Sequence, residues 1–204
     1  MKKLKQKAYF KVAALVAGVA WSSISFASPL TNGDFSSNNF NGWQGDVTSA
    51  GPISSLPGSF GSNFDASSGA AVLTADNTEW SVHLFQTFDL SSTALALNFD
   101  YSWVADDTSD TWIAQLVDTS NTSHFLSFDT ASAGASGNGQ FDLSGFSGLS
   151  VQLLFGLENI AGSNDTLTID NIAITESQPN GSVPEPSALL LISAGLLAAK
   201  RKFS

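Results

Sequence analysis

The chain has 204 residues and no cysteine, so no disulfide can stabilise it and its fold depends on a hydrophobic core. All 8 Lys and Arg residues lie within 2–11 or 200–202, and all 18 Asp and Glu residues lie between these two segments. A middle region without Lys or Arg excludes nucleic acid as a partner, because phosphate binding relies on those side chains. It also disfavours anionic lipid surfaces and acidic polysaccharides.

Residues 1–27 have the organisation of a secretory signal peptide. Several lysines precede the apolar run 12–20, and Ser25-Phe26-Ala27 supplies the small residues that signal peptidase requires. The run is too short to cross about 30 Å of hydrocarbon. We therefore predict an N-terminal signal helix, cleavage after Ala27 by signal peptidase, and export of the rest of the chain.

Residues 28–176 are expected to form a single domain of short strands. Large residues alternate with small or polar ones in 95–103 and 151–157, and Val82, Leu84, Gln86, Phe88 and Leu90 share one face of another strand. Further candidate strands are 70–75, 111–118, 123–129 and 167–175. About eight strands with antiparallel-type alternation and no crossover helix predict an all-β antiparallel sandwich of the jelly-roll type.

The last candidate strand contains a phase change. Leu167 and Ile169 share one parity, whereas Ile172 and Ile174 share the other. A slip of one residue would turn every following side chain to the opposite face of the sheet. The pattern therefore predicts a β-bulge at Asp170-Asn171.

The segment 103–112 places a tryptophan on each side of an acidic loop. Trp103 and Trp112 could stack on sugar rings, while Asp106, Asp107 and Asp110 could accept sugar hydroxyls or bind Ca²⁺. The alternative is structural, with Trp103 on the buried face of its strand and the acids in a solvated turn. The sequence leaves both interpretations open.

Catalysis has little support in the sequence. His83 and His124 are far apart, and neither lies in a zinc-binding arrangement, so a surface position is the more typical interpretation. The 18 acids supply many pairs that a glycan hydrolase could use, but no Gly-x-Ser-x-Gly motif is present. We expect a protein that is not an enzyme and requires no cofactor, with a carboxylate-based hydrolase as the alternative.

The C-terminal end has a linker at 177–182 and a tail at 183–204. Pro184-Glu185-Pro186 cannot lie inside a helix, and the apolar segment 188–199 that follows ends in Lys200-Arg201-Lys202. The positive-inside rule keeps such a basic end on the cytoplasmic side. We therefore expect a C-terminal apolar helix that contacts the inner membrane transiently.

The tripeptide, apolar segment and basic end of this tail resemble the PEP-CTERM sorting signal of Gram-negative bacteria. The resemblance implies that a membrane-embedded exosortase recognises the tripeptide, removes the tail and passes the protein to the cell surface or extracellular matrix. It also implies an association with extracellular polysaccharide.

A second resemblance involves both ends of the middle domain. The opening segments 30–35 and 41–43 and the closing segment 167–172 resemble the first and last strands of galactose-binding-like carbohydrate-binding modules. This resemblance implies that the end strands pair and that Asp34 and Asp170 help to hold a structural Ca²⁺. The sequence departs from that family at Ser36, where an acidic residue is common.

Together these features predict an exported, non-catalytic binding or structural module, with extracellular polysaccharide as the expected ligand. A purely structural matrix protein without affinity for glycans is the alternative to a binding role.

Overall fold

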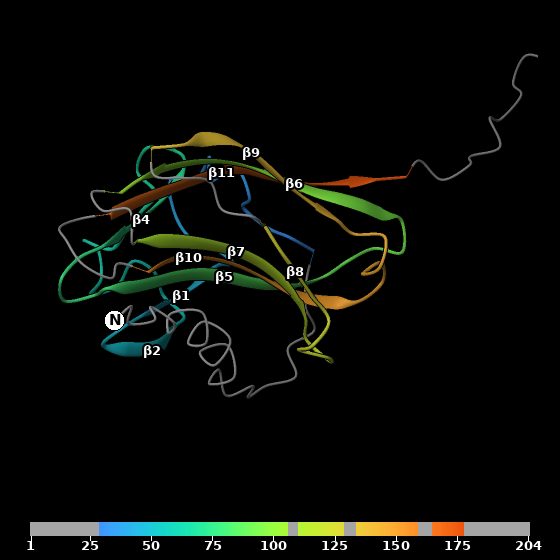
Figure 1. The fold of residues 1–204 in the computed structure, drawn as a ribbon, viewed down its shortest axis with the longest axis horizontal. Helices are drawn as coiled ribbons and strands as arrows, with labels where there is room; N and C mark the ends of the chain where they lie inside the picture. The colour runs from blue at the N-terminus through green and yellow to red at the C-terminus, as the bar shows by residue number, and fades with distance from the viewer. Residues whose placement is uncertain (1–28, 106–109, 129–133, 159–164, 178–204) are drawn as a thin grey trace, which may run out of the picture.

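The computed structural model describes residues 29–105, 110–128, 134–158 and 165–177. Within them, eleven strands form two antiparallel sheets that pack face to face (Figure 1). Sheet A contains, in spatial order, β2 (Ala50–Ile53), β1 (Gln44–Val47), β5 (Ser81–Asp89), β10 (Ser150–Glu158), β7 (Thr111–Asp118) and β8 (Phe125–Ser127). Sheet B contains β3 (Phe64–Asp65), β4 (Ala71–Ala75), β11 (Asp165–Glu176), β6 (Ala94–Val104) and β9 (Ser136–Asp142).

The structure confirms the predicted all-β antiparallel sandwich. Each strand expected from alternation is present within a few residues, and four further strands, β1, β2, β3 and β9, were not predicted. Three of the four are short, and β9 has the polar, glycine-rich sequence Ser-Gly-Asn-Gly-Gln-Phe-Asp, which lacks the apolar alternation that marks a strand. The expected signal helix in 1–27 and apolar helix in 183–204 lie outside the described residues. In the described part of the chain, no helix has the length and apolar character to cross a membrane.

Aromatic side chains fill the space between the sheets. The ring of Phe99 on β6 meets that of Phe155 on β10 with centroids 5.0 Å apart in an edge-to-face arrangement. Trp43 packs against Phe155 from the segment that precedes β1. Such contacts between inward-facing residues of two sheets are the main source of stability in a sandwich without disulfides.

The predicted bulge is present in β11. Asp170 lies opposite Asp100 of β6, whereas Ala173 lies opposite Asn98, so two residues of β11 face the single residue Phe99. Asn171 takes the left-handed conformation at φ 52°, which Asn tolerates better than most residues. The bulge is what allows both Ile169 and Ile172 to point into the core despite their odd spacing.

A second irregularity corrects the expectation for Leu95. Alternation in 95–103 predicts Leu95 on the same face as the buried Leu97, but its side chain is 48% exposed. The register shifts at this point, because Thr175 pairs with Ala96 while Glu176 pairs with Ala94. Ala94 therefore takes the inward position, and Leu95 turns outward.

The opening segment is not a strand, which corrects the expectation that residues 30–35 form one. It nevertheless connects the two sheets, because the side-chain amide of Gln86 on β5 bonds to the backbone of Thr31, and the carbonyl of Gly33 accepts from the amide of Ile172 on β11. A Cβ atom at residue 33 would overlap the Ile172 carbonyl. The predicted contact between the two ends of the domain thus exists as one backbone hydrogen bond beside the bulge.

Candidate functional site

Both tryptophans of the predicted sugar platform lie in the core. Trp112 is fully buried and Trp103 is 4% exposed, and the ring of Trp112 packs on Tyr101 at a centroid distance of 4.9 Å. Neither ring presents a face to solvent on which a sugar could stack. The structure therefore corrects the binding interpretation of these two residues and supports the structural alternative.

The predicted calcium ligands are distributed over several places. Asp106 and Asp107 lie outside the described residues, and Asp110 is buried just before β7. Asp34 accepts hydrogen bonds from the backbone and hydroxyl of Ser36, and Asp170 lies opposite Asp100 across β11 and β6. Among the described residues no three His, Asp or Glu side chains are grouped so that they could hold a metal ion. The calcium site stays a prediction.

The outer face of sheet A carries both apolar and polar side chains. We use this name for the side chains of β1, β5, β10, β7 and β8 that point away from sheet B. Strand register places in its central rows the residues Gln44, Phe85, Leu154, Gln115 and Ser127, and next to them Thr87, Gln152, Val117 and Phe125. Phe85 and Val117 are only 5% exposed and lie outside the main core cluster, whereas Phe125 is 52% exposed. This face thus combines apolar side chains with neutral amides and hydroxyls.

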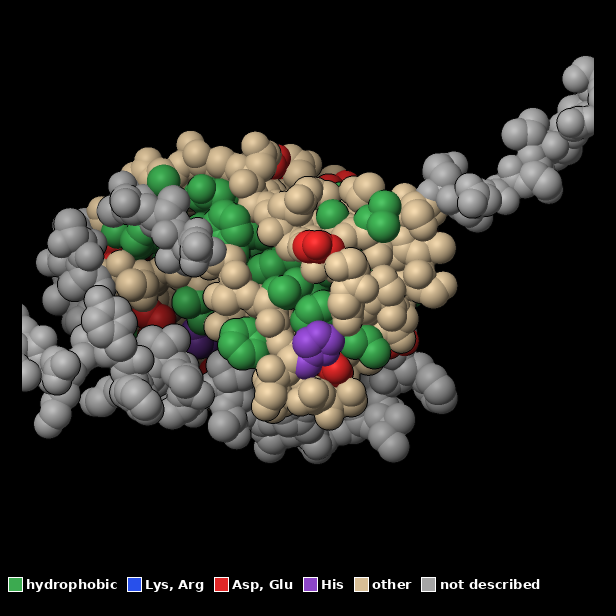
Figure 2. Space-filling model, turned by 45° about the vertical axis from the view of Figure 1, so that its right-hand side comes forward, with side chains coloured by type: hydrophobic (Ala, Val, Ile, Leu, Met, Phe, Trp, Pro, Cys, Tyr) green, Lys and Arg blue, Asp and Glu red, His purple; other side chains and the backbone are tan. Residues whose placement is uncertain are grey.

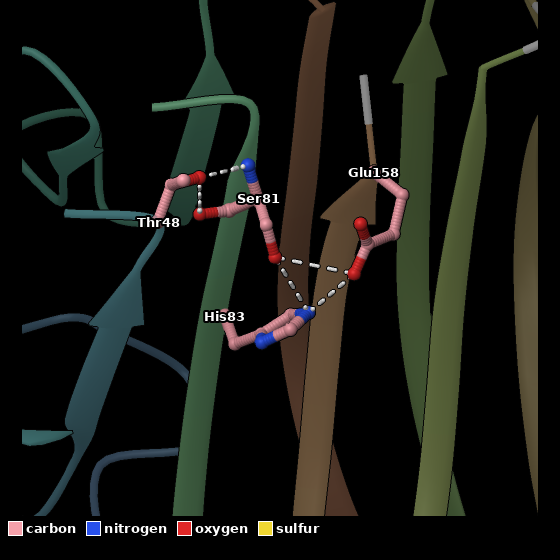
Figure 3. A network of polar contacts seen from close by, with 4 residues as sticks. All are labelled: Thr48, Ser81, His83 and Glu158. Atoms are coloured by element: carbon pink, nitrogen blue, oxygen red, sulfur yellow. Dashed lines mark hydrogen bonds and ion pairs between the residues drawn. The ribbon is translucent and has the colours of Figure 1, made fainter. Parts of the chain in front are cut away.

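A polar network lies at one end of this face, where Ser81 of β5 is opposite Glu158 of β10 (Figure 3). Glu158 Oε1 accepts a hydrogen bond from Ser81 Oγ at 3.1 Å and lies 3.1 Å from His83 Nε2. The hydroxyl of Thr48 accepts from the backbone amide of Ser81 at 2.8 Å and holds the start of β5 beside the end of β1. The imidazole of His83 is accommodated because its neighbour is Gly156, where a Cβ atom would overlap the ring.

This network has the residue types of a catalytic triad but not its geometry. In a triad the acid orients one imidazole nitrogen while the nucleophile contacts the other. Here Ser81 Oγ, at 3.4 Å, and Glu158 Oε1 both approach the same atom, His83 Nε2. The acid therefore does not orient the opposite nitrogen of the ring, and the arrangement does not activate Ser81 as a nucleophile.

Asp46 extends the network onto β1, where it lies opposite His83. Burial raises the pKa of the Asp46 carboxyl above its ordinary value, and this effect exceeds the opposing attraction of His83 and a backbone hydrogen bond. The sequence places no Lys or Arg in the domain that could relieve this carboxylate. Asp46 is thus a partly buried acid on the outer face of sheet A.

Trp80 adds an exposed aromatic ring to this end. It immediately precedes Ser81 in the chain and is 44% exposed, whereas the other tryptophans of the described residues are buried. In the sequence, nothing around Trp80 distinguishes it from a core residue. Trp80 comes directly before β5, so its backbone lies at the end of sheet A that carries the network, which is known only from the pairing of β5 with β1 and β10.

In the turn between β7 and β8, His124 stacks on Phe146 of the core with ring centroids 4.1 Å apart. Its Nδ1 lies 3.4 Å from the carboxylate of Asp118, which is mostly buried. In the view of Figure 2, a histidine lies beside an acidic side chain, and no Lys or Arg side chain appears on the described surface. His124 is 40% exposed, in agreement with the surface position that the sequence favours.

Many acids of the domain bond to nearby backbone amides in place of cationic partners. Hydrogen bonds from the backbone and side chain of Ser67 lower the pKa of Asp65, and those from the amides of Glu79 and Thr78 lower that of Asp76. Asp142 accepts from Ser144 in the same way. These local turns explain how a domain without Lys or Arg accommodates its acids.

The family comparison concerns the tail. Residues 182–202 match the PEP-CTERM protein-sorting motif, so this is an exported protein that is sorted through the membrane. The resemblance of the tail to that signal is confirmed. No curated protein sequence matches the chain.

Comparison with solved structures concerns the sandwich. TmCBM61 in complex with β-1,4-galactotriose is 15% identical, with a TM-score of 0.50 over 76% of this chain and 100% of that chain. The N-terminal cellulose-binding domain of Cellulomonas fimi β-1,4-glucanase C is 17% identical, with a TM-score of 0.44 over 75% and 99%. A CBM4 structure is also 17% identical, with a TM-score of 0.42 over 67% and 96%. At these identities the first likeness establishes the jelly-roll fold and nothing about the ligand.

Proposed function

We propose that this protein acts outside a Gram-negative cell, at the surface or in the extracellular matrix, as a non-catalytic module that binds polysaccharide through the outer face of sheet A. The observation that carries the proposal is the composition of that face. Sugars present both C–H groups and hydroxyls, and they bind where apolar side chains alternate with amides and carboxylates. Leu154 and Phe125 supply the first kind of contact, and Gln115 and Gln152 supply the second.

The tail supports the route to that location. We propose that signal peptidase removes the N-terminal segment and that an exosortase recognises Pro184-Glu185-Pro186, while Lys200, Arg201 and Lys202 stay on the cytoplasmic side of the inner membrane. The final destination is then the surface or the polysaccharide matrix. The tail itself contributes nothing to the ligand preference of the sandwich.

The geometry of the polar network supports a role in binding. Because Ser81 and Glu158 share one nitrogen of His83, the three side chains hold one another and leave no nucleophile with a base of its own. Contacts by this face also require no cofactor, since its polar groups are side-chain amides, hydroxyls and carboxylates.

The test is binding of the exported protein to insoluble and soluble polysaccharides, measured by pull-down and affinity electrophoresis. We expect Trp80→Ala and Phe125→Ala to weaken retention by roughly tenfold each, as loss of an aromatic contact to a sugar would. Leu95→Ala and Val104→Ala are matched controls, because they remove exposed apolar side chains from sheet B. Equal retention of all four variants would refute the assignment of the site to sheet A.

A further inference from the structure

The outer face of sheet A carries negative charge that the domain itself does not balance. Asp46 and Glu158 lie on two strands of this face, on either side of β5. All Lys and Arg residues lie in segments 2–11 and 200–202, so only protonated His83 or His124 could supply a positive charge between them. The acids of the whole domain add a field of the same sign, which attracts cations and repels anions.

The burial of Asp46 in the free protein also favours a cationic ligand. Its carboxyl is partly buried, and this raises its pKa even though His83 and a backbone hydrogen bond act in the opposite direction. A desolvated carboxylate is unfavourable until a cation or a strong donor pairs with it. Glu158 Oε1 already accepts from Ser81 and approaches His83, so that site is arranged around a carboxylate that accepts donors.

The apolar part of the face limits what the cation can be. A bare metal ion would gain nothing from Leu154, Phe85 and Phe125, and no three described acids or histidines are grouped to ligate one. A basic peptide would present long flexible stems, whereas a sugar ring presents a flat C–H face with an amine fixed directly on the ring. The second chemistry matches a β-sheet face on which carboxylates lie beside apolar side chains.

We propose that the outer face of sheet A binds a polysaccharide with free amino groups, a polymer of hexosamine units that are at least partly unacetylated. The ammonium groups pair with Asp46 and Glu158, and the sugar rings pack on Leu154, Phe125 and Trp80. This inference rests on the proposed function and names its ligand class. It also gives the absence of Lys and Arg from the domain a functional reason, since a cationic side chain near this face would compete with the ligand.

The experiment compares two oligosaccharides that differ only in acetylation, the hexamers of glucosamine and of N-acetylglucosamine, by calorimetric titration of the full-length protein. We expect the glucosamine hexamer to bind at least about tenfold more tightly, and this preference to shrink as salt is raised from low to physiological concentration. The double variant Asp46→Asn, Glu158→Gln keeps side chains of the same size and should bring the ratio of the two affinities close to one. Asp142→Asn, an exposed acid on sheet B, is the control and should leave the ratio unchanged.

Each further outcome has one meaning. If both hexamers bind with equal affinity, and Trp80→Ala weakens the binding of both, the amine preference is overturned but polysaccharide binding remains. If poly-lysine of matched charge binds as tightly as the glucosamine hexamer, charge pairing alone explains the binding, and this inference is also overturned. Absence of binding to either hexamer and to all polysaccharides in the pull-down would remove the proposed function itself.

Discussion

The side-chain amide of Gln86 and the backbone of Thr31 pair in both directions, with the Thr31 amide donating at 2.8 Å and the Thr31 carbonyl accepting at 3.1 Å. Gln86 points toward the core from β5 and is 4% exposed. It thereby takes the place of a neighbouring strand and anchors the opening segment, which reaches β11 through Gly33. A polar residue among the apolar positions of this strand is therefore a structural contact between the two sheets.

Replacing Gln86 by Leu should lower the free energy of unfolding by roughly 1–3 kcal/mol, because two buried hydrogen bonds are lost while the side chain keeps a similar size. Urea unfolding measures the change. Gln152→Leu on the outer face of β10 is the control and should have little effect on stability. If both variants unfold at the wild-type urea concentration, the opening segment does not contribute to the fold.

Asp46→Asn should stabilise the domain near neutral pH. The raised pKa means that folding disfavours the charged form of this carboxyl. The resulting loss of stability is present above the pKa of the folded state and disappears as the pH falls below the pKa of the unfolded state. Because Asp46 is only partly buried, the gain should be a few tenths of a kcal/mol. Thermal unfolding at pH 7 and pH 3.5 should show the gain at the higher pH only, and a gain of equal size at both would contradict desolvation of this carboxylate as its cause.

Asp76→Ala should have the opposite pH dependence. Hydrogen bonds from the amides of Glu79 and Thr78 lower the pKa of Asp76, so its contribution is complete above the ordinary value of 3.8 and is lost as the pH falls through the folded pKa. Because solvent screens this carboxylate, we expect a loss of only about 0.5–1 kcal/mol at pH 7, measured by urea unfolding, and a smaller loss near pH 3. A loss at Asp76 that does not vary with pH would point to a different origin.

Gly156→Ala should disrupt the polar network. The added methyl group would overlap the imidazole of His83 and touch Ile113, so the ring must leave its position beside Glu158. We expect a destabilisation of roughly 1–3 kcal/mol and loss of the chemical environment of His83 in NMR spectra. Gly51→Ala on β2 is the control, since a Cβ atom there meets nothing within 4 Å. Unchanged His83 resonances in Gly156→Ala would mean that the ring does not lie over this glycine.

Much of the fold followed from side-chain alternation, including the bulge at Asp170-Asn171, because inward and outward positions differ sharply in polarity. Leu95 could not be placed in the same way, since its outward position depends on a register shift opposite Thr175 and Glu176. Residues 30–35 resemble the first strand of galactose-binding-like modules, but in the structure they bond to the side chain of Gln86 and, through the Gly33 carbonyl, to the amide of Ile172. These features depend on contacts between residues far apart in the chain.

The candidate site was harder to predict for the same reason. Trp103 and Trp112 stood out because they flank an acidic loop, but alternation within their strands directs both rings inward. Alternation along the strand puts Phe85 on the face opposite Leu84, yet its neighbours Gln44 and Leu154 come from β1 and β10 and are known only from the pairing of strands. His83 and Glu158 likewise meet only in the folded sheet.

Binding of polysaccharide to the outer face of sheet A can be mapped residue by residue. The measurement is an NMR titration of the isotopically labelled protein with the oligosaccharide that binds best, read at each backbone amide and at the indole of Trp80. We expect chemical-shift changes concentrated in β5, β10, β7 and β8 and at Trp80, with little change in β4, β11 and β6. Changes centred on the strands of sheet B, with Trp80 and Phe125 unaffected, would show that the sugar binds elsewhere and that the proposed site is wrong.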